Sequence, residues 1–392
     1  MTGAAPLRVC LVCPYYAPHV GGVESHVHDL ARYLVKRGDA VTVLTSRFSR
    51  MLPALERREG VTVRRVPTLL NLMRTPLMPA LYREVMKGGW DVVHSQSPPP
   101  VTAYFACTAA NNIGVPHVLT YHADDEIPLP AVGPIIVAVY RETMGRYTFA
   151  HSDQVVVSTQ TYASTSRLVW SYDPEVIGAA IDPSRFGPGI DGSHVRASLG
   201  IPPPEEGHMV LFVGRLVPHK GVEFLLEAVH RLRPSATVVV AGEGPQRQAL
   251  QRSAEALGVG TRVVFAGGVP HEELPTYYRA ADVLVLPSIS RLEAFGLVGL
   301  EAMASERPVV LSDIPGVREV IEDGKEGLLA PPADPEGLAA RINELLDDPG
   351  RRREMGARGR ERVLRLFTWD VVGAQFRDIY ERLAADGAGE PR

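Results

Sequence analysis

Seven residues separate two glutamates, Glu293 and Glu301, and these seven are mostly apolar and include two glycines. An apolar run ending at Leu286 precedes them, which predicts a buried strand, a loop, and a helix beginning near Phe295 or Gly296. The first-turn N–H groups of such a helix have no partner within the helix and can bind a phosphate. The carboxylates would then bracket an anionic ligand, although the spacing alone also fits an ordinary buried helix with solvated ends.

Two cationic side chains, Arg215 and Lys220, follow another apolar run in the glycine-containing loop 214–221. Arg can bind two oxygens of a diphosphate at once and Lys acts as a point charge, so the pair predicts a diphosphate site where either residue alone would be a surface charge. The glycines of 242–245 and 267–271 permit a close backbone approach, and the second of these loops is suited to meeting a planar base through main-chain groups.

In the first half of the chain, Gly21 and Gly22 lie between an apolar strand over 7–13 and a helical pattern over 23–37, with another strand over 40–45. This order is a βαβ unit with a glycine pair at the helix N-terminus. It lacks the third glycine of the dinucleotide fingerprint, which argues against a dinucleotide-dependent oxidoreductase.

The alternation of strands and helices continues through both halves, which predicts an α/β protein of two doubly wound, Rossmann-like domains with a ligand cleft between them. A stretch rich in Pro, Gly and Asp, 174–191, marks the boundary, so we place the domains at 1–185 and 186–369. The segment 370–392 is a final helix with apolar residues at helical spacing and a frayed tail.

The composition is that of a soluble globular protein: of 392 residues 45% are apolar and 22% charged, and the net charge is -4. Binding to nucleic acid is not expected, because it usually requires a basic surface. No signal peptide or membrane span is expected, which predicts a cytoplasmic protein. The basic and apolar segment 47–87 is either a variable insertion or a contact with the acceptor or a membrane surface, and the oligomeric state stays open.

Together these motifs resemble the retaining GT-B glycosyltransferases of glycosyltransferase family 4, the glycosyl transferases group 1. The resemblance covers nearly the whole chain and rests on Gly21-Gly22, G-R-L-V-P-H-K-G at 214–221, G-E-G-P at 242–245 and E-A-F-G-L-V-G-L-E at 293–301. It implies a nucleotide-sugar donor held by the second domain, an acceptor on the first, and a final helix that packs back on the first domain.

The resemblance also implies roles for individual residues. The four catalytic candidates are His122, Arg215, Lys220 and Glu293. The donor-binding candidates are Gly21, Gly22, Arg215, Lys220, Gly244, Val269, Glu293, Phe295, Gly296, Leu297, Val298 and Glu301, with Glu301 on the ribose and Glu293 on the sugar hydroxyls. The acceptor-binding candidates are His19, Tyr121, Asp124 and Asp125.

We therefore predict a retaining hexosyltransferase that uses a UDP- or GDP-sugar and needs neither a metal nor another cofactor, because Arg215 and Lys220 can neutralise the departing diphosphate. Two carboxylates beside a sugar allow double displacement, and the family resemblance favours same-face attack; both stay open. The acceptor is open as well. The alternatives are a nucleotide-sugar 2-epimerase and a non-catalytic protein that binds nucleotide sugars.

Overall fold

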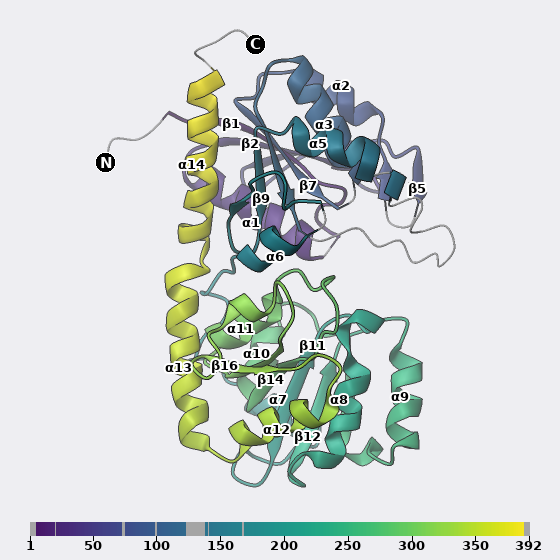
Figure 1. Cartoon of the computed structure of the whole chain (residues 1–392), viewed down its shortest axis with the longest axis vertical. Coiled ribbons are helices and arrows are strands. Elements are labelled where there is room, and N and C mark those ends of the chain that lie inside the picture. The colour runs from purple at the N-terminus through teal and green to yellow at the C-terminus, as the bar shows by residue number, and fades with distance from the viewer. Residues whose placement is uncertain are drawn as a thin grey trace. The chain divides into compact units, whose positions relative to one another are not determined.

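The computed structural model describes residues 5–19, 21–72, 75–98, 100–122, 138–139, 141–166 and 168–387 (Figure 1). The chain divides into two compact units, the first containing residues 1–179 and 369–392 and the second residues 180–368. Each unit is built around its own mainly parallel sheet with helices between the strands, which is the predicted α/β arrangement.

The first unit contains an eight-stranded sheet in the order β10-β9-β8-β7-β1-β2-β4-β3, and all neighbouring strands are parallel except β3 and β4. The chain extends from β1 first to β2 and later to β7, so the sheet is doubly wound with its switch point between β1 and β7. Its strands are β1 (Arg8–Val12), β2 (Ala40–Ser46), β3 (Leu55–Arg58), β4 (Val61–Val66), β7 (Val92–Ser97), β8 (His117–Tyr121), β9 (Gln154–Val157) and β10 (Glu175–Val176). Its helices are α1 (Gly22–Lys36), α2 (Ala80–Met86), α3 (Pro100–Asn112), the π-helical turn η1 (Arg141–Gly145), α5 (Arg146–Ala150), α6 (Gln160–Thr165) and α14 (Trp369–Gly387).

The segment 47–87 has more regular structure than its composition predicted. Strand β3 pairs antiparallel with β4, and β5 (Leu70–Leu72) and β6 (Thr75–Leu77) form a separate two-stranded hairpin. Helix α2 follows and packs against α3. Two apolar side chains of this segment are strongly exposed: Met51 is 93% exposed and Leu69 is 75% exposed.

The second unit contains a six-stranded, wholly parallel sheet in the order β13-β12-β11-β14-β15-β16. The chain extends from β11 through β12 to β13 and then returns to β14 on the other side of β11, so the switch point lies between β11 and β14. The strands are β11 (His208–Val213), β12 (Ala236–Ala241), β13 (Val263–Gly267), β14 (Val283–Leu286), β15 (Val309–Ser312) and β16 (Gly327–Ala330). The helices are α7 (Ser193–Ser198), η2 (Pro218–Lys220), α8 (Val222–Ala228), η3 (Val229–Arg231), α9 (Arg247–Ala256), η4 (Gly260–Arg262), α10 (Leu274–Ala280), α11 (Leu297–Ala304), η5 (Arg318–Val320), α12 (Pro335–Leu346) and α13 (Pro349–Leu366).

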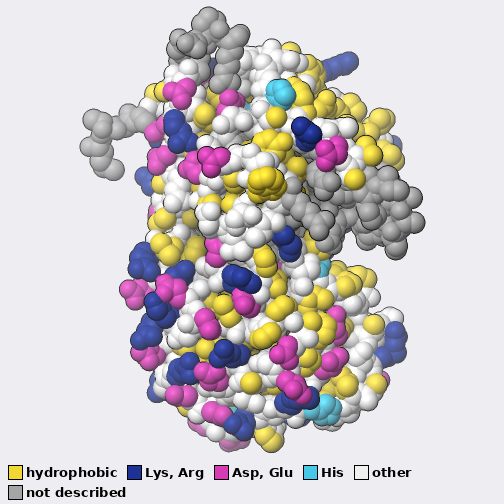
Figure 2. Space-filling view, viewed as in Figure 1, with side chains coloured by type: hydrophobic (Ala, Val, Ile, Leu, Met, Phe, Trp, Pro, Cys, Tyr) yellow, Lys and Arg dark blue, Asp and Glu magenta, His cyan; other side chains and the backbone are white. Residues whose placement is uncertain are grey.

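The surface carries both signs of charge. On the face shown in Figure 2, Lys and Arg side chains alternate with Asp and Glu side chains over the second unit. In the part of the chain that the structure describes, no helix is both long and apolar enough to cross a membrane. Whether the segment 47–87 contacts a membrane surface stays a prediction.

The last helix, α14, packs against α1 in the first unit. Gly373 permits this approach, because a Cβ atom there would lie 2.5 Å from Cδ1 of Tyr33. An ion pair adds to the contact: Arg377 Nε donates to Asp39 Oδ2 at 3.0 Å, and the Leu7 N–H donates to Asp39 Oδ1 at 3.0 Å. The carboxylate of Asp39 is fully buried, so its charge depends on these donors.

We expect Arg377→Met to lower the free energy of unfolding of the first unit by about 3 kcal/mol, because it leaves the buried Asp39 carboxylate without its cation. The control is Arg382→Met, which removes a solvent-exposed pair with Glu175 and should cost less than about 1 kcal/mol. Urea unfolding followed by tryptophan fluorescence isolates this unit, since Trp90, Trp170 and Trp369 all belong to it. Equal losses in the two variants would contradict the prediction.

Candidate functional site

The loops after β11 and β14 meet at the switch point of the second sheet, where an open α/β sheet binds its ligand. The first loop closes with the turn η2 and Gly221, whose φ of +63° is in the left-handed region. A Cβ atom at Gly221 would lie 2.2 Å from the carbonyl oxygen of Pro287, so only glycine permits this approach. The Ile289 N–H donates to the His219 carbonyl oxygen at 2.9 Å and joins the loops further.

This approach brings Lys220 and Glu293 together. The Lys220 ammonium donates to Glu293 Oε2, and the Ser288 hydroxyl donates to the same oxygen at 2.9 Å. Both side chains of the ion pair are largely buried. Burial alone would raise the pKa of Glu293, but the Lys220 charge and the hydrogen bonds from Lys220 and Ser288 hold that pKa below its usual range. Glu293 is therefore an ionised carboxylate at neutral pH.

The sequence interpretation named Arg215 and Lys220 in this loop but missed His219. Burial, with the nearby Lys220 charge, lowers the pKa of His219, so its imidazole is neutral at neutral pH. Arg215 is exposed and lies close enough to act on His219 through its charge. Ser288 was missed as well, although its position two residues after a strand of four buried apolar residues was a usable signal.

Helix α11 begins at Leu297, close to the predicted start, with Gly296 as its N-cap at φ +83°. A Cβ atom at Gly296 would lie 2.7 Å from Cδ2 of Leu286, so the turn from strand to helix needs glycine. The N–H groups of Leu297 and Val298 belong to the first turn, where helix geometry supplies no acceptor. They can donate to an anion placed there.

Glu301 lies one turn further along α11 and is buried. Its Oε2 accepts a 2.5 Å hydrogen bond from the hydroxyl of Tyr278, a residue of α10 that the sequence interpretation missed. Burial raises the pKa of Glu301 to about 7, against the hydrogen bond from Tyr278 and the charge of Arg185, which both lower it. The two glutamates thus differ in charge state: Glu293 is held ionised, and Glu301 titrates near neutral pH.

The glycine loop 242–245 packs against the loop after β11. A Cβ atom at Gly242 would lie 1.8 Å from the carbonyl oxygen of Gly214, and one at Gly244 would lie 2.3 Å from that of Leu216. These glycines were expected to permit a close backbone approach, and the structure shows such an approach by the neighbouring loop. That Gly244 also contacts the donor stays a prediction. Val269 is half-buried in the loop after β13.

Two of the other candidates have side chains in hydrophobic cores. Phe295 is 6% exposed, and its ring meets the edge of Phe367 at a centroid distance of 5.7 Å. Tyr121 is 1% exposed and packs against Phe149 at 5.2 Å in the first unit. These rings therefore stabilise their cores.

In the first unit, His122 directly follows β8 at the carboxyl end of the sheet. Its backbone N–H donates to the Ser97 carbonyl oxygen at 2.8 Å, and its ring Nε2 lies 2.7 Å from Gln96 Oε1. Its ring meets the edge of His26 from α1 at 5.3 Å. Burial lowers the pKa of His122 to about 4, so the imidazole is neutral at neutral pH.

The glycine pair of the first unit lies at the start of α1, with Gly21 as N-cap and Gly22 as the first helical residue. A Cβ atom at Gly21 would lie 2.3 Å from Oε2 of Glu24, so the chain's own carboxylate occupies the space beside this glycine. The other oxygen of Glu24 is 3.1 Å from Nδ1 of His19, which stacks on Tyr15. His19 thus lies beside the glycine pair.

Asp124 and Asp125 lie outside the described residues. Among the residues that are described, no three His, Cys, Asp or Glu side chains are grouped closely enough to hold a metal ion. That a metal is not needed stays a prediction.

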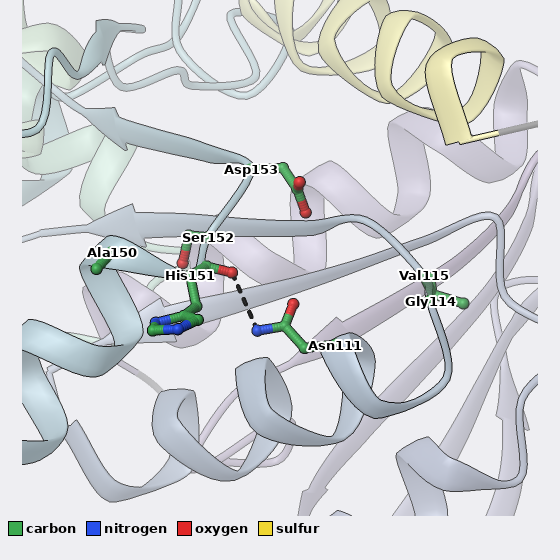
Figure 3. Close-up of a pocket in the computed structure, with 7 residues that line it drawn as sticks. All are labelled: Asn111, Gly114, Val115, Ala150, His151, Ser152 and Asp153. Carbon is green, nitrogen blue, oxygen red and sulfur yellow. Dashed lines mark hydrogen bonds between the residues drawn. The ribbon is translucent and has the colours of Figure 1, made fainter. Parts of the chain in front are cut away.

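A cavity of about 300 Å³ in the first unit is lined by Asn111, His151 and Asp153 among others (Figure 3). Asp153 and Val115 lie just before β9 and β8, at the edge of the sheet opposite His122. The Asn111 amide donates to the His151 carbonyl oxygen at 3.2 Å and ties α3 to the loop before β9. This cavity contains none of the candidate residues.

Known proteins resemble this chain over nearly its whole length. The model of the Glycosyl transferases group 1 matches residues 199–362, and that of Glycosyltransferase Family 4 matches residues 20–185. A D-inositol 3-phosphate glycosyltransferase from Acidothermus cellulolyticus is 32% identical over 97% of this chain and 91% of its own length. A phosphatidyl-myo-inositol mannosyltransferase from Mycolicibacterium smegmatis is 31% identical over 97% and 95%.

A solved structure, sucrose-phosphate synthase from Thermosynechococcus elongatus, superposes with a TM-score of 0.77 at 25% identity, covering 97% of this chain and all of the other. The predicted fold class is confirmed by this match.

The raised pKa of Glu301 predicts how the free energy of unfolding depends on pH. Its pKa in the folded protein, about 7, lies above its ordinary value of 4.5, so the folded state keeps a proton that the unfolded chain releases. The free energy of unfolding should therefore fall as the pH rises from about 4.5 to about 7, by roughly 3 kcal/mol from this residue. Glu301→Gln should remove this loss, because Gln stays neutral and still accepts from Tyr278.

We expect Glu301→Gln to stabilise the second unit at pH 8 and to leave it nearly unchanged at pH 5. Urea unfolding followed by circular dichroism at both pH values measures this. The control is Glu336→Gln on the solvent-exposed side of α12, which should change stability little at either pH. A Glu301→Gln variant that is less stable than the native protein at pH 8 would show that the ionised carboxylate is stabilising.

Proposed function

The chain belongs to glycosyltransferase family 4, the glycosyl transferases group 1, and on that premise we propose that it is a retaining hexosyltransferase that uses a nucleoside-diphosphate sugar. The observation that carries the proposal is the Lys220–Glu293 pair, which joins the loop after β11 to the loop that leads into α11. It combines a cation for the diphosphate with an ionised carboxylate for the sugar, next to first-turn amides that suit a phosphate.

In this proposal the second unit binds the donor. Lys220 uses one of its three N–H groups on Glu293, which leaves two for the diphosphate. Arg215 adds a second cation, and the N–H groups of Leu297 and Val298 donate to phosphate oxygens. These charges stabilise the departing nucleoside diphosphate without a metal ion.

The two glutamates would hold the ends of the donor. Oε2 of Glu301 already accepts from Tyr278, and its other oxygen would accept from a ribose hydroxyl. Oε2 of Glu293 accepts from Lys220 and Ser288, and its other oxygen would accept from a sugar hydroxyl. Because two donors, one of them the Lys220 cation, already stabilise the Glu293 carboxylate, it is a weak nucleophile, which favours same-face attack over double displacement.

The first unit would bind the acceptor, with His122 and His19 as the candidate contacts among the described residues. Two relatives suggest the acceptor class, because D-inositol 3-phosphate and phosphatidyl-myo-inositol both carry an inositol phosphate group. We therefore propose an inositol phosphate, free or lipid-linked, as the acceptor, and a UDP- or GDP-hexose as the donor.

The proposal predicts that the protein transfers a hexose from a UDP- or GDP-α-hexose to an inositol phosphate and gives an α-linked product. Proton NMR of the product reads the anomeric configuration, and a β-linked product would refute retention. Activity should survive EDTA, and its loss would refute the metal-free mechanism. Epimerisation of the donor without acceptor would point to the epimerase, and binding of a nucleotide without turnover would point to a non-catalytic binding protein.

Lys220→Met should lower kcat about 10²- to 10³-fold, the range seen when one group that stabilises developing negative charge is removed. It also leaves the buried Glu293 carboxylate without its cation. The control is Lys325→Met, whose pair with Glu322 is exposed and which should leave kcat and KM unchanged. A rise in the donor KM with kcat unchanged would make Lys220 a ground-state anchor only.

A further inference from the structure

A chain of polar side chains connects His122 to the last helix of the first unit. His122 Nε2 lies 2.7 Å from Gln96 Oε1, and the amide nitrogen of Gln96 lies 3.1 Å from His94 Nε2. His94 Nδ1 lies 2.6 Å from the Tyr380 hydroxyl of α14. His94 and Gln96 are two residues apart on β7, so their side chains lie on the same face of the sheet.

The types of these groups fix the direction of each hydrogen bond. An amide oxygen can only accept, so His122 Nε2 must carry a hydrogen and donate it to Gln96. The amide nitrogen of Gln96 donates, so His94 Nε2 carries no hydrogen, and its single lone pair is shared between the Gln96 amide and the Thr120 hydroxyl, whose Oγ1 lies 2.7 Å away. The hydrogen of neutral His94 is then on Nδ1 and is donated to the Tyr380 oxygen. Every bond in the chain is satisfied with both imidazoles neutral.

The surroundings of the chain also favour neutral rings. Burial lowers the pKa of His122 to about 4 and that of His26, from α1, to about 3, and it lowers the pKa of His94 well below its ordinary value. His117 on β8 acts on His94 in the same direction, and Asp39 acts through its charge on Tyr380. Among the residues that the structure describes, no carboxylate forms a hydrogen bond with His122 or His94.

We propose that Gln96 is a positioning residue that fixes His122 as the tautomer with its hydrogen on Nε2, so that Nδ1 presents a lone pair to a substrate hydroxyl. This inference rests on the proposed function, in which His122 contacts substrate. In this tautomer Nδ1 accepts a hydrogen bond from a hydroxyl and cannot donate one. His122 is therefore a neutral acceptor, and Gln96 holds its tautomer and its orientation.

The tautomer can be read without any substrate. Nitrogen-15 NMR of the histidine-labelled full chain distinguishes a protonated from an unprotonated ring nitrogen, and His122→Gln identifies the signal. We expect Nε2 protonated and Nδ1 unprotonated at pH 7. A hydrogen on Nδ1 would overturn the proposal, because Gln96 would then donate to His122 instead of accepting from it.

Gln96→Met tests the effect on the reaction. It removes the amide at similar size, so we expect a mixture of His122 tautomers and a roughly 10- to 100-fold lower kcat, as for other residues that orient a functional histidine. The control is Gln154→Met on β9, which bonds to Arg382 and not to this chain. Normal kcat in Gln96→Met, with transfer by the native protein established, overturns the positioning role alone. A native protein without transfer activity overturns the proposed function. The NMR measurement of the tautomer needs no substrate, so its result does not depend on either activity measurement.

Gln96→Glu keeps the size of the side chain and its acceptor oxygen. It therefore tests the positioning role with little risk that the variant fails to fold. Its carboxylate should preserve the Nε2–H tautomer and raise the pKa of His122, because a nearby negative charge favours the imidazolium. Protonation of Nδ1 removes the acceptor, so transfer by Gln96→Glu should fall on acidification at a higher pH than in the native protein. An unchanged pH profile with an unchanged His122 titration by NMR would overturn the proposal.

Discussion

The second unit depends on the close approach of two loops at its switch point. Gly221 lies against the Pro287 carbonyl, and any side chain there would separate the loops. Their contact buries Lys220 against Glu293, and two charges can be buried at this depth only as a pair with further hydrogen bonds, which Ser288 supplies. Gly296 makes the tight turn from β14 into α11. The electrostatics of the site thus follow from a steric requirement of the backbone.

The same requirement explains why two glutamates in one short stretch behave differently. Glu293 lies on the loop, where a cation bonds to it, and its pKa is lowered. Glu301 lies inside the helix, where its hydrogen-bond partner is the neutral Tyr278 hydroxyl, and burial raises its pKa to about 7. Residues of one type whose environments move their pKa values apart are suited to separate tasks. A permanently ionised carboxylate suits the part of a substrate close to developing charge, and a titrating one suits hydroxyl recognition.

Much of the fold was predictable because its strands are short runs of β-branched and aliphatic residues, as in β12 and β14, bounded by glycine or proline. The hairpin of β5 and β6 was not predictable, because strands of three residues are too short to show a hydrophobic periodicity.

The positions of the site residues could be predicted, because they lie in loops that follow strands. Their partners could not: Lys220 and Glu293 are 73 residues apart, and Tyr278 and Glu301 lie on different helices. Tyr121 was named as an acceptor-binding candidate, and the structure places its ring in the core. Adjacent strand residues point to opposite faces, which is why Tyr121 and its neighbour His122 have different surroundings.

The two units share one sheet topology, but they differ in the charge of the polar groups at the carboxyl ends of their strands. At the carboxyl edge of the second sheet the polar groups are charged and paired, as Lys220 and Glu293 are, which suits a ligand that carries phosphate. At that edge of the first sheet, His122, Gln96 and His94 are neutral and satisfy one another, which suits a ligand recognised through hydroxyls. Burial drives both outcomes, because a buried group either has a counter-charge or gives up its charge. Whether a buried polar group keeps its charge therefore depends on which partners the loops and strands bring to it.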